Sequence, residues 1–181
     1  MKKFIGMIAV LCLLSAFFGC ASKPPASKGM PPNVANARRD APADVLVGIG
    51  PAKMGTKNQS INIATTRARA EISNTMNSMV RNMVRDYTAS SEVDPDARVA
   101  YQENITVTLS KSNISGAEIK FIEPDDEGYW WVVMWLSKAN VVKEISQAQA
   151  VARLAVPKMA SFDAEQRMNE AFEQLRKEEG Y

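Results

Sequence analysis

The residue types that carry most acid–base and nucleophilic chemistry are missing from nearly the whole sequence. None of the 181 residues is His, and the two cysteines, Cys12 and Cys20, both lie near the N-terminus. A His general base, a Ser–His–Asp triad and a His-ligated metal therefore cannot form. Downstream of Cys20 there is no thiol nucleophile, no Cys-ligated zinc and no disulfide. We predict a protein that is not an enzyme and that uses no cofactor or metal.

One segment has the spacing of a phosphate-binding loop without its chemistry. Gly50 to Lys57 lies between a predicted strand and a predicted helix. A P-loop ends in Lys followed by Ser or Thr, so that the amine reaches the phosphates and the hydroxyl reaches magnesium. Here Thr56 precedes Lys57. We therefore interpret Gly48 and Gly50 as residues that let the chain turn off a strand.

Residues 1–19 have the pattern of an export signal. Lys2 and Lys3 give a positive start, an uncharged and mostly apolar run follows, and Gly19 precedes Cys20. The apolar run is typical of a cleaved signal and short for a bilayer span. Removal of residues 1–19 leaves 20 basic and 20 acidic residues. A chain with this balance has no net charge to attract nucleic acid, and we expect no such partner.

Ala16 to Cys20 resembles the lipoprotein box of bacteria, in which a small residue precedes a cysteine that receives diacylglycerol. The resemblance implies a lipid on Cys20, which would hold the protein on a membrane without a spanning helix. Because no Asp follows Cys20, it also implies the outer membrane. The alternative is an ordinary secretory signal with a coincidental cysteine. Residues 20–43 hold five of the nine prolines, so we expect them to form an extended tether that buries no core.

Residues 44–138 are predicted to form the central domain. Asp44 to Gly50 is a short β-branched run and reads as a buried strand. Gln59 to Tyr87 carries one apolar stripe at helical spacing, and Ala64 and Ala68 would let its first half lie close on a sheet. The stripe includes three methionines, which we interpret as core residues in preference to an adaptable binding face: Met76, Met79 and Met83.

The remaining segments alternate in type. Tyr101 to Leu109 fits a strand by its alternation, but Asp94 and Pro95 form a good helix start, so we expect a helix over Asp96 to Ser110. Ala117 to Ile122 and Tyr129 to Leu136 are predicted strands, and the second is apolar on both faces. Such a strand must be covered on both sides. We expect helices on one face, and a C-terminal helix or another subunit on the other.

Residues 139–181 are predicted to add two C-terminal helices, Asn140 to Ala155 and Ser161 to Glu179, the second with Ser161 as its N-cap. The second helix has an apolar stripe that includes Met168 and Phe172. We expect it to pack on its own domain, with a docking or self-assembly helix as the alternative.

Asp44 to Ile72 resembles the LPP-twenty family of bacterial outer-membrane lipoproteins, through the rhythm of small residues set by Gly48, Gly50, Ala64 and Ala68. Segments that begin at Gly116 and Gly128 fit the closing hairpin of the family. The resemblance implies an α+β fold, a two-layer sandwich with a small three-stranded, mostly antiparallel sheet packed by helices. It implies no catalytic activity. Some members are flagellum-associated and assemble into rings, and others are surface antigens.

These features predict an envelope lipoprotein that acts as a structural or assembly module, on the periplasmic face or at the cell surface. A second copy of the chain and envelope or flagellar proteins are the expected partners. Trp130, Met134 and Phe172 are the candidate contact residues, chosen from their apolar surplus. The alternative is a periplasmic ligand-binding or chaperone-like module, in which Met and Trp residues line an apolar groove.

Overall fold

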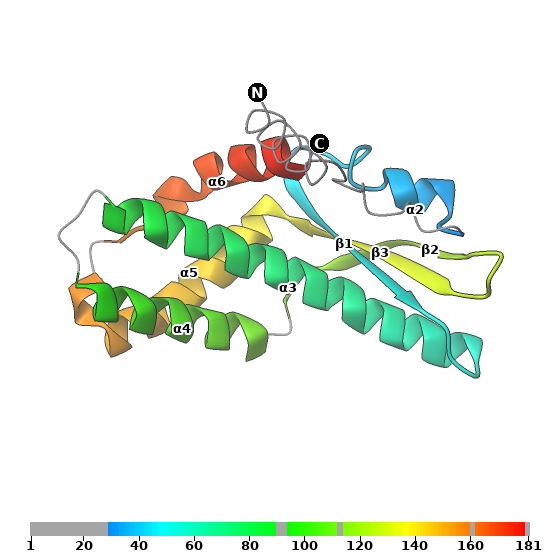
Figure 1. The fold of residues 1–181 in the computed structure, drawn as a ribbon, viewed down its shortest axis with the longest axis horizontal. Coiled ribbons are helices and arrows are strands. Elements are labelled where there is room, and N and C mark those ends of the chain that lie inside the picture. Colours follow the sequence, from blue (N-terminus) through cyan, green and yellow to red (C-terminus); the bar gives the residue numbers. More distant parts are fainter. Residues whose placement is uncertain (1–28, 90–93, 112–113, 160–161, 180–181) are drawn as a thin grey trace, which may run out of the picture.

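The computed structural model describes residues 29–89, 94–111, 114–159 and 162–179 (Figure 1). Three antiparallel strands form one sheet in the order β1-β3-β2. The strands are β1 (Val45–Ala52), β2 (Glu118–Pro124) and β3 (Trp130–Ser137). The predicted α+β class, with a small three-stranded antiparallel sheet, is confirmed.

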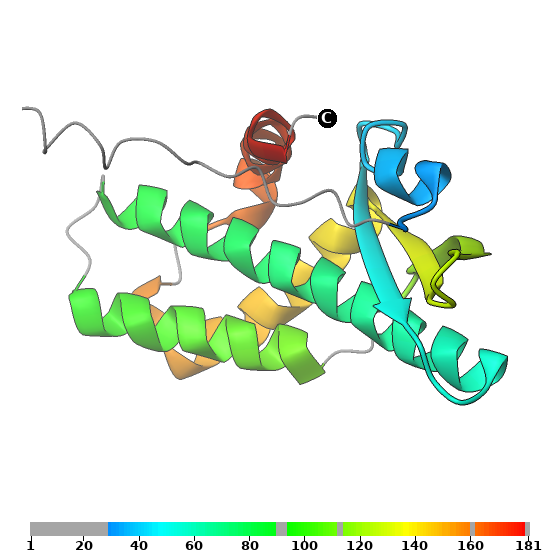
Figure 2. The ribbon, with the colours of Figure 1, turned by 45° about the vertical axis from the view of Figure 1, so that its right-hand side comes forward.

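Helices lie on both faces of this sheet. The long helix α3 (Lys57–Ala89) runs along one face and continues well past the sheet (Figures 1 and 2). The short helix α2 (Pro32–Asn36) lies on the other face. The second half of α3 packs with the remaining helices, which are α4 (Pro95–Lys111), α5 (Lys138–Ala155), α6 (Ala164–Glu179) and the short 3₁₀ turn η2 (Pro157–Met159).

Two glycines in β1 allow α3 to approach the sheet at backbone distance. A Cβ atom on Gly50 would lie 2.0 Å from the carbonyl oxygen of Ala64, and one on Gly48 would lie 2.2 Å from that of Ala68. Both alanines are fully buried, which confirms that they face the sheet. The interpretation of the glycines as turn residues was wrong: both lie inside β1, and their lack of a side chain makes room for the helix.

The second half of α3 supplies one side of the main hydrophobic core. Its predicted methionines are buried there, together with apolar side chains from α4, α5 and α6. This confirms that they are core residues. Residues of the central and C-terminal segments share this single core, so α5 and α6 are integral to the fold. The three methionines are Met76, Met79 and Met83.

The ambiguous segment is the helix α4. Asp94 Oδ1 accepts a hydrogen bond from the Asp96 amide at 3.0 Å and so caps the first turn. Tyr101, Ile105 and Leu109 are buried at four-residue spacing. The alternation that suggested a strand arose because the exposed Val107 happens to fall between two of these core positions.

The N-terminal segment departs from the prediction of an extended tether. Residues 20–28 lie outside the described residues, but the segment after them folds onto the sheet. Val34 and Ala37 are buried against Val47, Trp131 and Val133 of the sheet. The second face of β3 is thus covered by residues 29–41 of the same chain, and the expectation of a C-terminal helix or another subunit there was wrong. This segment packs on the sheet because it carries apolar residues at helical spacing among its prolines: Met30, Val34, Ala37 and Ala41.

Helix α6 packs on its own chain, as expected. Met168 and Phe172 are buried against α3 and α5. The Nζ atom of Lys138, at the start of α5, lies 5.3 Å from the centre of the Phe172 ring and donates a hydrogen bond to Asn169. The predicted N-cap, Ser161, lies outside the described residues.

The contact between α3 and β1 can be tested at Gly50. We expect Gly50→Ala to lower the free energy of unfolding by about 3 kcal/mol, because the added methyl group meets helix backbone that cannot move aside. Gly55→Ala is the matched control and should change the stability by less than about 0.5 kcal/mol, since its Cβ would meet only Gln59 Oε1, at 3.9 Å. Urea unfolding measures both. Equal stability of the two variants would contradict the close approach of α3 to β1.

Candidate functional site

The three predicted contact residues do not form one surface. Met134 is fully buried under α3, and Phe172 is buried between α6 and its neighbours. Neither presents a side chain to a partner, so both assignments are corrected to core residues. Trp130 is partly exposed at the end of β3, where Lys57 Nζ lies 4.5 Å from the centre of its ring. Cys20, the predicted lipid site, lies outside the described residues.

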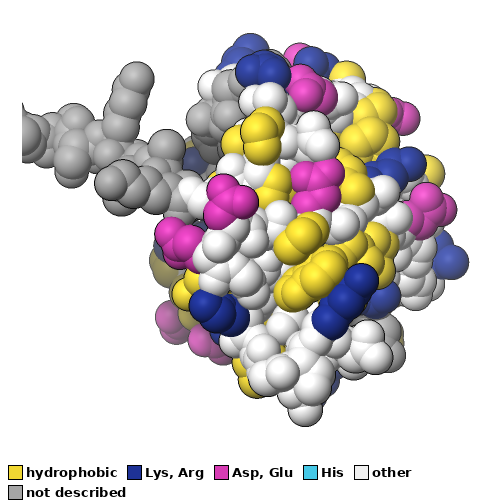
Figure 3. Space-filling model, turned by 90° about the vertical axis from the view of Figure 1, so that its right-hand side faces the viewer, with side chains coloured by type: hydrophobic (Ala, Val, Ile, Leu, Met, Phe, Trp, Pro, Cys, Tyr) yellow, Lys and Arg dark blue, Asp and Glu magenta, His cyan; other side chains and the backbone are white. Residues whose placement is uncertain are grey.

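Trp130 belongs to a cluster at one end of the molecule, which we call the hairpin-end surface. It consists of residues from the β1–α3 loop and the β2–β3 hairpin: Lys53, Met54, Lys57, Tyr129 and Trp130. Lys53 Nζ donates a hydrogen bond to the Glu127 carbonyl at 2.6 Å and lies 5.8 Å from the centre of the Tyr129 ring. Met54 is 50% exposed and Tyr129 is 37% exposed. Figure 3 views this end, where hydrophobic side chains gather beside Lys or Arg side chains.

The hairpin that carries this surface is held by one carboxylate. Asp125 Oδ1 accepts hydrogen bonds from the amides of Glu127, at 2.9 Å, and Tyr129, at 2.8 Å. Its Oδ2 accepts one from Trp131 Nε1 at 2.8 Å. Desolvation raises the pKa of Asp125, but these hydrogen bonds outweigh it and hold the pKa below its ordinary value. The turn is therefore fixed to the sheet as long as Asp125 is ionised.

The two outer edges of the sheet differ in how they are covered. On β1, the Ile49 amide donates to Glu71, whose carboxylate also binds Arg38 of the N-terminal segment. Arg67 Nη1 donates to the Pro51 carbonyl at 2.6 Å. Side chains of α3 thus occupy the β1 edge. On the β2 edge, residues 118–120 are exposed, including Ile119 at 45%, and the only irregularity is a bulge between Ile119 and Phe121.

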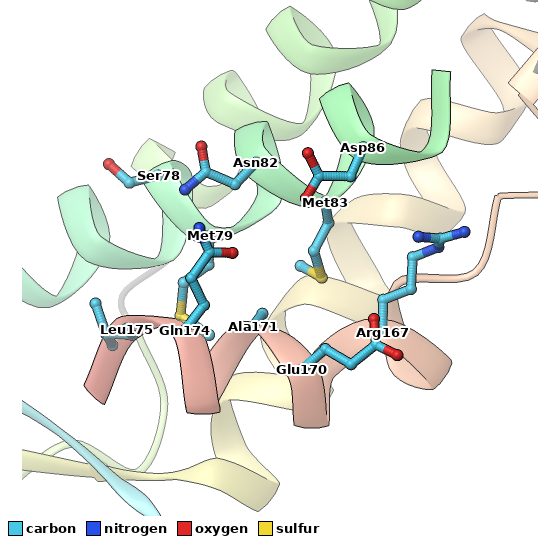
Figure 4. A pocket seen from close by; sticks show the side chains of 10 residues that line it. All are labelled: Ser78, Met79, Asn82, Met83, Asp86, Arg167, Glu170, Ala171, Gln174 and Leu175. Carbon is cyan, nitrogen blue, oxygen red and sulfur yellow. The ribbon is translucent and has the colours of Figure 1, made fainter. Parts of the chain in front are cut away.

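A small groove separates α3 from α6 (Figure 4). Its volume is about 120 Å³. Met79 and Met83 extend from α3 toward α6 and form its apolar part, while Asp86 and Arg167 lie toward one end. The groove is lined in addition by Ser78, Asn82, Glu170, Ala171, Gln174 and Leu175. Six of these ten residues are polar or charged and none is Trp, so the groove is less apolar than the Met- and Trp-lined groove expected for the alternative function.

The most strongly shifted group in the described part of the chain is a buried tyrosine. Burial raises the pKa of Tyr101 to about 12, and the nearby Arg153 opposes this shift. Its ring packs edge-on against Phe162, with 5.7 Å between ring centres. Tyr101 therefore stays protonated at neutral pH inside the core, where we interpret it as a structural residue.

Within residues 29–89, 94–111, 114–159 and 162–179, no three His, Cys, Asp or Glu side chains come together as metal ligands. The helices of the same ranges all lack the length or the apolar character needed to cross a bilayer. Comparisons with protein-family models, with curated proteins and with solved structures found no match for this chain.

Sequence reasoning missed the residues that position the hairpin-end surface. Asp125 lies in an acidic stretch of the sequence, and its role depends on Trp131 lying across the hairpin. An Asp at the start of a tight turn can accept a hydrogen bond from the backbone amide two residues later, and this position of Asp is a signal that can be read from the sequence. Glu71 had no signal of this kind, because its partners, Arg38 and Ile49, lie far away in sequence.

The role of Asp125 predicts a pH-dependent contribution to stability. Since its pKa is lower in the folded state than in the unfolded state, its stabilisation is present above about pH 4 and is lost as the pH falls through the folded pKa. At pH 7 we expect Asp125→Asn to lower the free energy of unfolding by about 1 kcal/mol. At pH 3 this difference should shrink. Urea unfolding at both pH values measures it, and the exposed Asp126→Asn should be neutral at each. A loss of the same size at pH 3 would contradict a role for the ionised carboxylate.

Proposed function

We propose that this chain is a lipoprotein of the bacterial cell envelope, anchored to the outer membrane through Cys20, that acts as a structural or assembly module without catalytic activity. The observation that carries the proposal is the position of Cys20, directly after an apolar export signal and a small residue. Two or three acyl chains on one cysteine give stable anchoring, whereas one chain binds weakly. The likeness of residues 44–72 to the LPP-twenty family supports the same assignment and adds flagellar proteins to the candidate partners.

The open β2 edge supports an assembly role. Exposed backbone groups on an edge strand can pair with a strand of another chain, and proteins commonly block such edges. Here α3 side chains cover the β1 edge, while the β2 edge carries the exposed Ile119 between two exposed charged residues, Glu118 and Lys120. The bulge after Ile119 limits the length available for pairing, so the association through this edge should be weak and dependent on concentration.

The groove between α3 and α6 supports the second candidate, a periplasmic ligand-binding or chaperone-like module. Its methionine side chains are adaptable apolar contacts. Its volume of about 120 Å³ admits only a small ligand or one side chain of a client peptide. A protein that is monomeric at every concentration and binds a hydrophobic probe between Met79 and Leu175 would favour this function over assembly.

The anchor is tested by replacing its cysteine. In a bacterial host that processes lipoproteins, we expect Cys20→Ser to lose the acyl mass and to keep residues 1–19, because diacylglycerol is added before cleavage in the signals that Ala16 to Cys20 resembles. Cys12→Ser is the matched control and should remain lipidated, because Cys12 lies inside the removed signal. Intact-mass spectrometry and membrane fractionation give the result. A mature wild-type chain with a free thiol at Cys20 would overturn the proposed anchor.

The assembly role is tested at the β2 edge. We expect residues 21–181, expressed without the signal and the lipidated cysteine, to form oligomers in a concentration series followed by native mass spectrometry. Ile119→Lys should weaken this association about tenfold, because a charge on an edge strand opposes pairing. Val107→Lys is the control, since Val107 is equally exposed but lies on α4. A monomer at all concentrations would contradict self-assembly, and equal effects of both lysines would exclude the β2 edge as the interface.

A further inference from the structure

We propose that the hairpin-end surface rests on the lipid bilayer that holds the acyl chains of Cys20. This inference rests on the proposed anchor and adds to it an orientation: the end of the molecule with Lys53, Met54, Lys57, Tyr129 and Trp130 faces the membrane. Three independent features support it, namely the place where the N-terminal segment joins the fold, the length of chain before that place, and the side chains of the surface.

The N-terminal segment joins the fold beside the tip of the β2–β3 hairpin. A Cβ atom on Gly29 would lie 3.5 Å from Glu127 Cδ and 3.6 Å from Asp125 Oδ2, both in the hairpin turn. The turn also contacts the β1–α3 loop, because Lys53 donates to the Glu127 carbonyl. The first described residue therefore lies next to the hairpin-end surface. The C-terminal end of α5 lies at the opposite end of the molecule (Figure 1).

The chain before Gly29 is too short to hold this surface far from a membrane. Only the eight residues 21–28 separate Cys20 from Gly29. A fully extended chain covers at most about 30 Å over that length. Lipid on Cys20 thus confines the hairpin end to a narrow layer above the headgroups, whereas the far end of α5 has no such constraint.

The side chains of the surface suit the interface between water and lipid. Tyr and Trp are enriched at this level because each combines an apolar ring with a polar atom. Lys53 and Lys57 lie over the rings of Tyr129 and Trp130 and can extend their charged ends toward headgroups. Met54, half exposed in the loop between them, adds an apolar side chain that has no role in the core.

Charge decides which kind of lipid contact this is. Asp125, Asp126 and Glu127, at the hairpin turn, outnumber Lys53 and Lys57, so the surface has no excess of positive charge. Attraction to anionic lipid therefore contributes little, and the contact depends on apolar insertion beside zwitterionic headgroups. Such a contact is weak alone and forms because the anchor holds the surface in place. It should be nearly independent of salt concentration, unlike binding through a basic patch.

The orientation can be measured with a single introduced thiol. The lipid on Cys20 blocks its thiol, and Cys12 is removed with the signal, so Met54→Cys carries the only reactive thiol of the mature lipoprotein. Leu154→Cys is the matched control, because Leu154 is 85% exposed near the C-terminal end of α5. Each lipidated variant is labelled with an environment-sensitive nitrobenzoxadiazole dye and reconstituted in phosphatidylethanolamine–phosphatidylcholine vesicles. Some of the vesicles contain lipids with brominated acyl chains.

We expect the dye at position 54 to show a blue shift of its emission and a loss of intensity with brominated lipid, at both low and high salt. The dye at position 154 should show neither. If the protein floats with the vesicles but brominated lipid does not quench the dye at position 54, the proposed orientation is wrong and the proposed anchor is unaffected. A blue shift of the dye at position 54 without quenching by brominated lipid would assign the surface to contact with a second copy. Equal quenching at positions 54 and 154 would also overturn the proposal. Protein that reacts with maleimide at Cys20 and fails to float would show instead that the anchor is wrong.

Discussion

The close packing of α3 against β1 is the contact on which the rest of the fold depends. Gly48 and Gly50 bring the strand to the backbone of the helix at Ala64 and Ala68, so the axis of α3 is fixed relative to the sheet. The same helix continues past the sheet, and its second half is the support on which α4, α5 and α6 build the main core. Two residues without side chains thus set the geometry that joins the sheet to the helical half.

The opposite face of the sheet depends on the N-terminal segment. Trp131 and Val133 would be exposed without Val34 and Ala37, and exposed apolar area of this kind favours association. Glu71 links the two faces, because its carboxylate binds both the Ile49 amide of β1 and Arg38 of that segment. The segment that would lead to the lipid anchor is therefore part of the folded domain, and the position of the anchor is coupled to the sheet.

Much of the fold could be predicted from local pattern. The stripe of α3 and the capping of α4 by Asp94 are signals contained within a few turns, and the structure confirms them. The failures concern the pairing of distant segments. The sequence around Trp131 requires a cover for β3 but does not say which segment provides it. The prolines near Val34 indicated an extended tether, although that segment is the cover. The assignment of Met134 and Phe172 as contacts fails for the same reason, because burial by the same chain and burial by a partner leave the same pattern in the sequence.

The proposed orientation limits what the open β2 edge can bind. With the hairpin end on the bilayer, β2 and β3 run away from the membrane. Antiparallel pairing of β2 with β2 of a second copy reverses one chain and moves its hairpin end off the bilayer, to the far side of the pair. β2 has seven residues and spans about 23 Å, so the displaced hairpin end still lies within the distance of about 30 Å that the eight residues before Gly29 can cover. Self-pairing of this kind is therefore compatible with shared anchoring only if the tether of one copy is nearly extended. Under the proposed orientation the β2 edge should therefore pair less readily with its own kind on a membrane than in solution, where no tether opposes the pairing.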